Sequence, residues 1–347
     1  MTQNATEERV LAAIGQRREL VNDAIDVELP LQEPERLYEA SRYILEAGGK
    51  RLRPTAALLV GEALAAVDGE VDHREFPTVT GGQVDLMAAV VSIEVIQSFT
   101  LIHDDIMDDD DLRRGVQSVH NQYDTSTAIL AGDTLYSKAF EIMADVGGKA
   151  ENTLEAMRLL SSTCTKICEG QSLDVAFESR DDLSPEEYLE MIERKTAVLY
   201  GAAAAIPAIL LDADQQVADA MYQYGIESGK AFQIQDDVLD LTVPSEKLGK
   251  QRGSDLVENK ETLITLHARQ QGVDVDGLLD GSTVETVTEA EIDEAVSKLE
   301  AVGSIDYARE KAEVLTEQSK QRLETLPDTE ASDLLADLAD YLISRGY

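Results

Sequence analysis

The sequence predicts an all-α fold, and three observations lead to that prediction. Apolar residues recur at helical spacing along most of the 347 residues, and convincing alternating strand patterns are absent. Two expected helices, around "LMAAVVSIEVIQSFTLIHDDIM" and "SGKAFQIQDDVLDL", are also apolar nearly all round. Because a surface helix would keep a clear polar face, we expect these two at the centre of a helical bundle.

Each expected helix follows from its apolar pattern and its ends. Pro54 opens one helix after a flexible Gly-Gly pair, since proline suits the first helical turn. The longest apolar run, Leu86 to Ile102, contains Glu94 and Gln97 and falls short of about 20 residues, so it predicts a buried helix and no membrane span. In chain order, the expected helices cover 5–24, 34–47, 54–66, 84–108, 124–147, 151–178, 185–208, 212–241, 260–271, 289–301, 304–325 and 330–344.

We predict one all-helical domain over residues 1–347. Length alone would also allow two domains, but no internal repeat of roughly 20 to 50 residues is visible. Residues 1–8 are expected to be flexible. The acidic, glycine-rich stretch 272–286 is expected to form a solvated surface loop.

Composition and charge narrow the possible partners. Apolar residues make up 43% of the chain, enough for a folded, soluble protein. Sixty-eight acidic residues against 30 basic ones give a net charge of −38, which repels nucleic acid and anionic lipid headgroups. Such a surface favours a protein adapted to a salty cytoplasm, where charge is strongly screened, although an ordinary acidic protein is the alternative.

The start of the chain and the cysteines carry no sign of export or of a metal centre. The first ten residues lack a basic segment followed by an apolar one, so we expect a cytoplasmic protein. Cys164 and Cys168 lie one helical turn apart, which suits small buried residues better than a disulfide.

Two aspartate motifs are the strongest chemical signal. Six aspartates lie in eight positions within "LIHDDIMDDDDLRRG", residues 101–115, and the DDxxD pattern recurs at 236–240. Residues four apart lie on one helix face, with Cβ atoms about 5–6 Å apart. The carboxylates of Asp104 and Asp108 are therefore expected to be neighbours, and so are those of Asp236 and Asp240. These carboxylates repel each other and oppose the helix dipole at a C-terminal end.

A solvated acidic face is the alternative explanation. For a single DDxxD motif, this explanation would be as good as a bound cation. Two copies, each ending a strongly apolar helix, favour a bound cation, because charges that enter a core need partners. Magnesium prefers oxygen ligands and is commonly shared between carboxylates and substrate phosphates. An EF-hand calcium loop fits worse, since the required glycine and terminal glutamate are missing after Asp104.

Basic residues are scarce here, and several cluster around the aspartate motifs or in glycine-rich turns. Arginine binds phosphate oxygens with two parallel hydrogen bonds, and lysine acts as a point charge. Each could instead pair with surface acids, an alternative that stays open most strongly for Arg51. The candidates are Lys50, Arg51, Arg53, Arg113, Arg114, Lys195, Lys250 and Lys260.

One metal-binding set and one purely basic set suit a reaction between two diphosphates. Metal ions would help one diphosphate leave an allylic carbon, while the basic residues would hold the other diphosphate intact. The carbocation that results needs an apolar, water-poor cavity.

The motifs resemble those of the trans-isoprenyl diphosphate synthases, or polyprenyl synthetases. They occur in the family's order across residues 48–256 and form a highly specific set. The matching stretches are "GGKRLRP", "HDDIMDDDDLRRG", "AILAGD", "EGQSLD", "KTA", "GKAFQIQDDVLD" and "LGK" with "GSDL".

The resemblance implies a homodimeric isoprenoid-synthase-type bundle around a central apolar cavity, with three Mg²⁺ ions per substrate-loaded site. It implies head-to-tail condensation of isopentenyl diphosphate with an allylic diphosphate. The implied metal residues are Asp104, Asp108 and Asp236, with Asp105, Asp237 and Asp240 in support. The implied allylic diphosphate residues are Arg113, Lys195, Thr196, Gln233, Lys250 and Lys260. The implied isopentenyl diphosphate residues are Lys50, Arg53, Gln97 and Arg114.

We expect product length to depend on Phe99, which lies five residues before Asp104 and so about 7.5 Å away along the helix. A phenylalanine there resembles the chain-length stop of archaeal C20 synthases, although ordinary core packing is the alternative. The resemblance therefore implies geranylgeranyl diphosphate for ether lipids, with C15 and C25 products as alternatives.

Other functions explain fewer of these features. A terpene cyclase or head-to-head synthase does not account for "GGKRLRP" beside two intact DDxxD motifs. A non-catalytic partner subunit would be expected to lose carboxylates or the Lys195-Thr196 pair. The chain departs from the family's usual pattern at Gln251, Asn259 and Ile264, which puts only the geometry of that loop in doubt.

Overall fold

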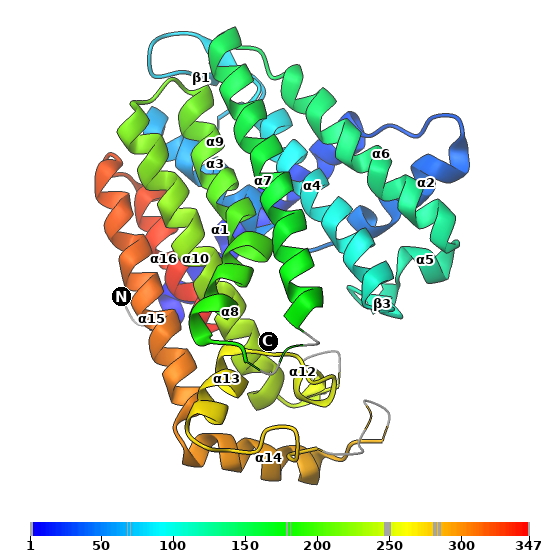
Figure 1. The fold of residues 1–347 in the computed structure, drawn as a ribbon. Helices are drawn as coiled ribbons and strands as arrows, with labels where there is room; N and C mark the ends of the chain where they lie inside the picture. Colours follow the sequence, from blue (N-terminus) through cyan, green and yellow to red (C-terminus); the bar gives the residue numbers. More distant parts are fainter. Residues whose placement is uncertain are drawn as a thin grey trace. The chain divides into compact units, whose positions relative to one another are not determined.

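A computed structural model describes residues 3–67, 69, 71–177, 180, 182–245, 251–279, 283 and 286–345. The all-α prediction is confirmed, since the described chain is helical apart from two hairpins of two-residue strands (Figure 1). The helices are α1 (Gln3–Glu28), α2 (Glu35–Glu46), α3 (Leu52–Ala65), α4 (Leu86–Met107), α5 (Val119–Gln122), α6 (Thr125–Ala144), α7 (Ala150–Phe177), α8 (Pro185–Ile192), α9 (Val198–Leu210), α10 (Gln215–Thr242), α12 (Ser254–Val257), α13 (Leu263–Gln270), α14 (Glu289–Ala301), α15 (Ser304–Arg322) and α16 (Glu330–Ser344).

The chain divides into two compact units, and the aspartate motifs belong to different ones. Unit 1 comprises residues 1–164, 201–222 and 323–338, and unit 2 comprises 165–200, 223–322 and 339–347. The helices α7, α9, α10 and α16 contribute residues to both units. One domain over the whole chain therefore stays a prediction.

The core of unit 1 is built around α4. This helix lies along α6, and α1 and α3 also pack against it (Figure 1). Asp85 caps its N-terminus by accepting a hydrogen bond from the N–H of Ala88 at 2.7 Å. Among the described helices, α4 is long and apolar enough to cross a membrane, but 83% of that apolar stretch is buried inside the protein, as a core helix requires.

Two short hairpins shape the loops of unit 1. The strands β1 (Phe76–Pro77) and β2 (Gln83–Val84) pair before α4, and β3 (Leu112–Arg113) and β4 (Val116–Gln117) pair after it. Between β3 and β4, Arg114 and Gly115 both have positive φ, at 55° and 79°. This is the pattern of a type I′ turn, which suits the twist of a two-residue hairpin.

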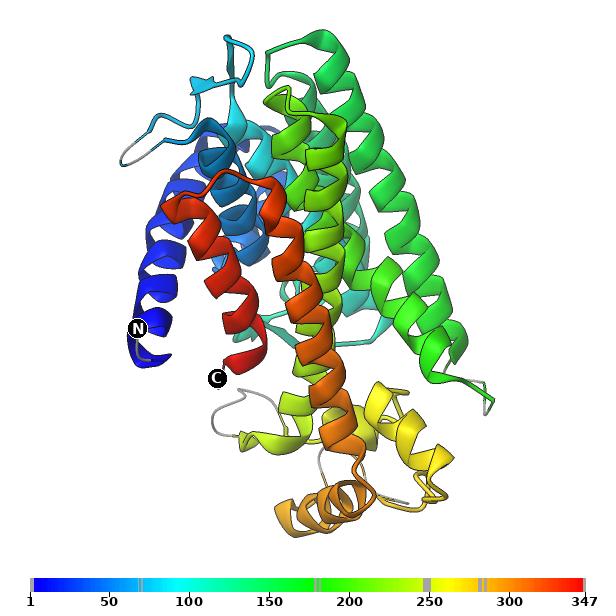
Figure 2. The same cartoon turned by 90° about the vertical axis from the view of Figure 1, so that its left-hand side faces the viewer.

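Unit 2 has its own apolar core, formed by α8, α13, α14, α15 and the last part of α10. Figure 2 shows α14 turned across the end of α15, with the chain reversing at Gly303, where φ is 73°. Thr288 caps α14 in a reciprocal arrangement with Glu291, which fixes where that helix begins. The predicted surface loop 272–286 precedes it and is described except at 280–282 and 284–285.

One predicted helix is interrupted where two of the predicted site residues lie. The sequence predicted a continuous helix over 185–208, but α8 and α9 are separated by the π-helix η1 (Glu193–Ala197). A π-helical turn inserts an extra residue and redirects the side chains around it, and such turns are frequent at functional sites. The residues that it redirects include Lys195 and Thr196.

Candidate active site

The first aspartate motif ends α4 and points its carboxylates in different directions. Asp104 is half-buried, and Asp108 is the exposed C-cap residue, whose N–H donates to the Asp104 carbonyl at 2.8 Å. Asp105 is fully buried. Helical geometry rotates it by about 100° from Asp104, so the two neighbours cannot share one face. Asp104 and Asp108 are thus the accessible pair.

Arg113 holds Asp105 in place from the β3–β4 hairpin. Its Nε donates to Asp105 Oδ1 at 2.6 Å, and its Nη2 donates to Asp110 Oδ2 at 2.6 Å. Burial raises the pKa of Asp105, and the Arg113 guanidinium only partly offsets this effect. The other oxygen, Asp105 Oδ2, is buried without a hydrogen-bond partner. A donor or a cation could still approach that oxygen.

A basic cluster around Glu94 forms the second part of unit 1's site. Glu94, the acid in the middle of the apolar α4, is buried and pairs with Arg51 and, at 3.5 Å, with Arg114. Arg114 also donates to the carbonyl of Ile44 at 3.0 Å. Gly49 has φ of 152°, and a Cβ there would lie 3.0 Å from the Arg114 guanidinium carbon. The Gly-Gly turn therefore makes room for Arg114.

The other predicted residues of this cluster keep some exposure. Lys50 is exposed, and Arg53 and Gln97 are half-buried, at the start of α3 and on α4. Arg51 is buried and binds Glu94, Asn22 and the Leu45 carbonyl, so its role is structural. The lone acid Glu94 in an apolar run was the sequence signal for this cluster, but its arginine partners could not be assigned from spacing.

In the second motif, only one aspartate is accessible. Asp237 and Asp240 are buried, with 6% and 1% of their surfaces exposed, while 31% of the Asp236 side chain is exposed. Asp240 accepts hydrogen bonds from Ser254 Oγ at 3.0 Å and from the N–H of Asp255 at 3.2 Å. It therefore ties the end of α10 to the start of α12.

Asp237 lies at the centre of a buried polar network. It accepts hydrogen bonds from the Tyr188 hydroxyl and, at 3.1 Å, from Gln233 Nε2, and Gln233 Oε1 accepts one from Thr196 at 3.1 Å. Burial raises the pKa of Asp237 well above its ordinary value, and nearby Asp255 adds to the effect. The network links three predicted site residues, and Tyr188 is a member that sequence reasoning missed.

The π-helix η1 presents Lys195 beside α7. Its ammonium forms an ion pair with Asp174, the last residue of "EGQSLD". A Cβ on Gly170 would lie only 2.2 Å from the Lys195 backbone nitrogen, so α7 can approach η1 this closely only with glycine there. This contact gives a physical reason for the glycine in "EGQSLD".

The remaining predicted diphosphate ligands lie in the loop after α10. Lys260 is exposed and forms an ion pair with Glu258 at 2.9 Å. Lys250 lies outside the described residues. Across the described ranges, no three side chains of His, Cys, Asp or Glu are already gathered as a metal site.

The carboxylates nevertheless fit a hard divalent cation. Asp104, Asp108 and Asp236 are the accessible oxygen donors, and the buried oxygen Asp105 Oδ2 has no partner. Mg²⁺ is commonly held by one or two carboxylates and completed by substrate phosphates and water. A finished cage of protein ligands is therefore not required here.

Phe99 belongs to an aromatic cluster between α4 and α6. Its ring centroid lies 4.8 Å from that of His103 and 5.2 Å from that of Tyr136, and Tyr136 lies 5.1 Å from Phe140. Phe99 is half-buried and Tyr136 is 36% exposed, so this cluster is not part of the fully buried core. The alternative of ordinary core packing is weakened.

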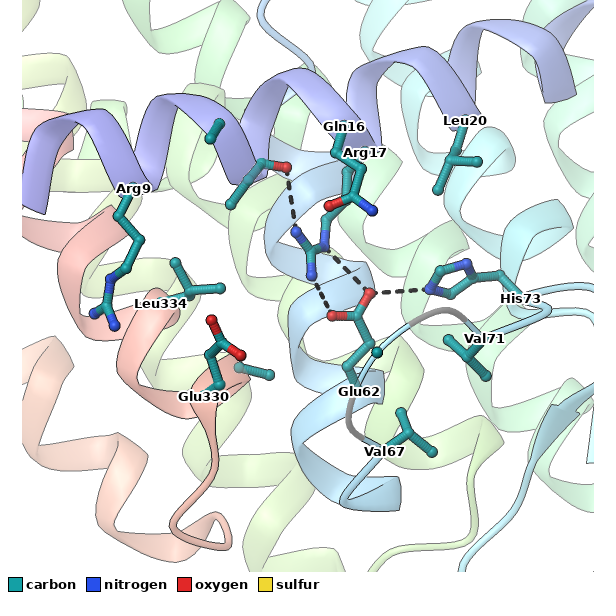
Figure 3. Close-up of a pocket in the computed structure, with 14 residues that line it drawn as sticks. Arg9, Gln16, Arg17, Leu20, Glu62, Val67, Val71, His73, Glu330 and Leu334 are labelled. Carbon is teal, nitrogen blue, oxygen red and sulfur yellow. Dashed lines mark hydrogen bonds and ion pairs between the residues drawn. The ribbon is translucent and has the colours of Figure 1, made fainter.

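A separate cavity of about 700 Å³ lies in unit 1, between α1, the end of α3 and the start of α16 (Figure 3). At its wall, Glu62 accepts hydrogen bonds from Arg17 and contacts His73 Nε2 at 3.0 Å. Nine residues along α3 separate Glu62 from Arg53, about 13 Å. The cavity is thus distinct from the basic cluster.

Known proteins similar to this chain agree with the geometry. The family model described as polyprenyl synthetase matches residues 34–299. The chain is 62% identical to a geranylfarnesyl diphosphate synthase of Natronomonas pharaonis, covering 98% of this chain and 99% of that protein.

Two solved structures extend the comparison. The geranylgeranyl pyrophosphate synthetase of the archaeon Geoglobus acetivorans has a TM-score of 0.85 and 43% identity, covering 96% of this chain and 99% of that one. A polyprenyl synthase of Caulobacter crescentus CB15, solved with calcium and isoprenyl diphosphate, has a TM-score of 0.79 and 28% identity, covering 99% of this chain and 98% of that one.

Proposed function

This chain belongs to the polyprenyl synthetase family and is a prenyltransferase, and we propose that it joins isopentenyl diphosphate head to tail (1′-4) to an allylic diphosphate. The observation that carries the proposal is the pair of DDxxD motifs, each at the end of a helix, with Asp104 and Asp108 accessible in the first motif and Asp236 in the second. The product is five carbons longer than the allylic substrate.

The residues divide between the two diphosphates. Asp104, Asp108 and Asp236 would hold Mg²⁺, three ions per loaded site, and the buried carboxylates Asp105, Asp237 and Asp240 would keep the motifs and adjoining loops in position. When bound, the metal supplies charge neutralisation for the departing diphosphate. The allylic diphosphate would also meet Arg113, Lys195, Thr196, Gln233, Lys250 and Lys260.

Isopentenyl diphosphate would bind the basic cluster of Lys50, Arg53, Gln97 and Arg114. This cluster contributes cations and an amide, so it holds that diphosphate without promoting its departure. The bond from C1 of the allylic substrate to its diphosphate breaks, and the alkene of isopentenyl diphosphate forms the new carbon–carbon bond. A proton then passes to the released pyrophosphate.

We propose a C20 product, geranylgeranyl diphosphate, because Phe99 and Tyr136 place two aromatic rings up the helix from Asp104. A C25 product is the second candidate, favoured by the 62% identity to a geranylfarnesyl diphosphate synthase. The C20 chain would serve archaeal ether-lipid synthesis in the cytoplasm.

The test is to incubate the purified full chain with Mg²⁺, labelled isopentenyl diphosphate and a C5, C10 or C15 primer in concentrated KCl. Chromatography of the products should show C20, and C25 would favour the second candidate. No elongation of any primer would contradict the proposed reaction and favour a non-catalytic partner subunit.

Phe99→Ala tests the chain-length role with the same assay. Removing the ring should shift the product distribution to longer chains, because the aromatic barrier between α4 and α6 becomes shorter. Phe140→Ala is the matched control, since among the described ring pairs Phe140 contacts Tyr136 and does not contact Phe99. An unchanged distribution in Phe99→Ala would remove Phe99 from the account.

We further propose a homodimer. In unit 1, the large apolar side chains of Ile129, Leu130 and Leu154 are 42%, 56% and 48% exposed on α6 and α7. Apolar surface of this kind favours burial against a second copy. Light scattering should give twice the 37.9 kDa chain mass, and a monomer at micromolar concentration would contradict the dimer.

A further inference from the structure

Arg345, the last described residue, is buried beside the second aspartate motif. Only 6% of its surface is exposed, and its backbone N–H donates to the Tyr341 carbonyl at 3.1 Å, which extends the end of α16. Its guanidinium donates to Asp236 Oδ1 and lies over the Phe232 ring, 3.9 Å from the centroid. Two contacts thus direct this cation to Asp236.

Asp236 is also where a metal ion would reach this motif. The carboxylate of Asp237 already accepts two hydrogen bonds, and that of Asp240 accepts two others. Both are nearly inaccessible, whereas Asp236 keeps 31% of its side chain exposed. The arginine therefore contacts the one aspartate of the motif that is open to a cation.

The surroundings explain why a cation is needed there when no metal is bound. Asp236 adjoins the buried Asp237, and the hydrogen bonds that Asp237 accepts come from the neutral groups of Tyr188 and Gln233, so the repulsion between the two neighbouring carboxylates is not offset there. The positive charge of Arg345 beside Asp236 reduces this repulsion. Because Arg345 is buried, salt screens its charge little. The Nε of Arg345 is buried without a hydrogen-bond partner, so the guanidinium is held but not fully satisfied.

We propose that Arg345 is a built-in counter-cation that occupies Asp236 in the metal-free protein and competes with the divalent metal for that carboxylate. Metal binding to Asp236 displaces the guanidinium, so Arg345 senses whether the motif is loaded. This inference rests on the proposed function, because it takes Asp236 to be a metal ligand.

The experiment measures Mn²⁺ binding to the substrate-free full chain by electron paramagnetic resonance, at one fixed KCl concentration. Arg345→Gln should bind Mn²⁺ about tenfold more tightly than the unaltered protein, since a charge-assisted competitor has been removed. Arg345→Lys keeps the charge but loses the planar group that lies over Phe232, so its Mn²⁺ affinity should fall between those of the unaltered protein and Arg345→Gln.

Two further variants locate the effect. Lys320→Gln is the matched control, because Lys320 pairs with Asp340 of α16 at 2.9 Å in the same unit, away from the motif. It should leave the affinity unchanged. The gain should vanish in Asp236→Asn/Arg345→Gln, which separates Asp236 from weak Mn²⁺ binding by other acids.

The proposal would be overturned if Arg345→Gln bound Mn²⁺ no more tightly than the unaltered protein. It would also be overturned if the gain in affinity persisted when Asp236→Asn was added. If Arg345→Gln does not fold, ¹⁵N-arginine spectra of the unaltered protein serve instead, with the Arg345 signal assigned through Arg345→Lys. Mg²⁺ should shift that signal, and an unmoved signal would overturn the proposal. The proposed function is tested separately, by whether the unaltered protein forms product in the primer assay.

Discussion

At the scale of single residues, neighbouring aspartates have different tasks. Asp104 and Asp236 remain accessible, while Asp105 and Asp237 are buried and bound by Arg113 and by Tyr188 with Gln233. Each DDxxD motif therefore combines accessible carboxylates, which we propose as metal ligands, with buried carboxylates that are hydrogen-bonded to neighbouring elements. The helical spacing of the sequence predicted which residues share a face, because that depends only on helix geometry.

The partners of these residues could not be predicted from spacing. Arg345 and Asp236 are 109 residues apart, and Arg51 and Glu94 are 43 apart. Such pairs depend on how whole helices pack. The sequence contains many acidic residues, and spacing alone does not indicate which of them a given arginine binds. The sequence could only indicate that a lone acid such as Glu94, within an apolar helix, needs a cation.

Glu62 provides a residue-scale test of stability against pH. Burial alone would raise the pKa of Glu62, but hydrogen bonds with His73 and Arg17 outweigh it and lower the pKa below the ordinary value. The carboxylate therefore contributes stability above the unfolded pKa of about 4.3, and this contribution is lost as the pH falls through the folded pKa.

Glu62→Gln should lower the free energy of unfolding by about 2 kcal/mol at pH 7, because it leaves Arg17 buried without its anion. The difference from the unaltered protein should shrink below about pH 4. Urea unfolding at several pH values measures it, with Glu141→Gln as control, since Glu141 is 61% exposed and its pairing contributes little. A difference that stays constant down to pH 3 would contradict this account.

At the scale of elements, most helices could be predicted because each has a clear apolar face and clear ends. Predicted and observed bounds agree for α14 and α16 and differ by a few residues for α1 and α13. The π-helix η1 could not be predicted, because the apolar pattern over 185–208 is that of one continuous helix. The close approach of Gly170 on α7 to the Lys195 backbone is a tertiary contact, and no local pattern in "ERKTA" indicates it.

Gly170→Ala tests the element that positions Lys195. The added Cβ would meet backbone atoms of Arg194 and Lys195, so α7 and η1 must separate. We expect kcat to fall about tenfold or more and the melting temperature to drop by several degrees. Gly15→Ala on α1 is the matched control, since nothing lies within 4 Å of its new Cβ and helix propensity favours alanine. Equal activity of both variants would contradict the role of this contact.

At the scale of the whole molecule, the net charge of −38 dominates the response to salt. Repulsion among 68 acidic residues opposes the compact state, and dissolved salt screens it. Raising KCl from about 0.1 M to about 2 M should therefore raise the melting temperature by roughly 10 °C. Sucrose, which favours burial without screening charge, is the control. A melting temperature that does not rise in KCl would contradict adaptation to salt.

We have proposed that accessible carboxylates from both motifs hold the metal for prenyl transfer. The most direct measurement compares kcat with Mg²⁺ for Asp104→Ala, Asp236→Ala and the control Asp109→Ala, whose fully exposed side chain lies in the same acidic run. Both motif variants should lose about a hundredfold or more in kcat. Asp104→Ala should melt near the unaltered temperature, because lost repulsion offsets lost contacts, whereas Asp236→Ala should melt lower, because it leaves the buried Arg345 without its anion. The control should keep its rate. Near-normal turnover by either motif variant would contradict the account.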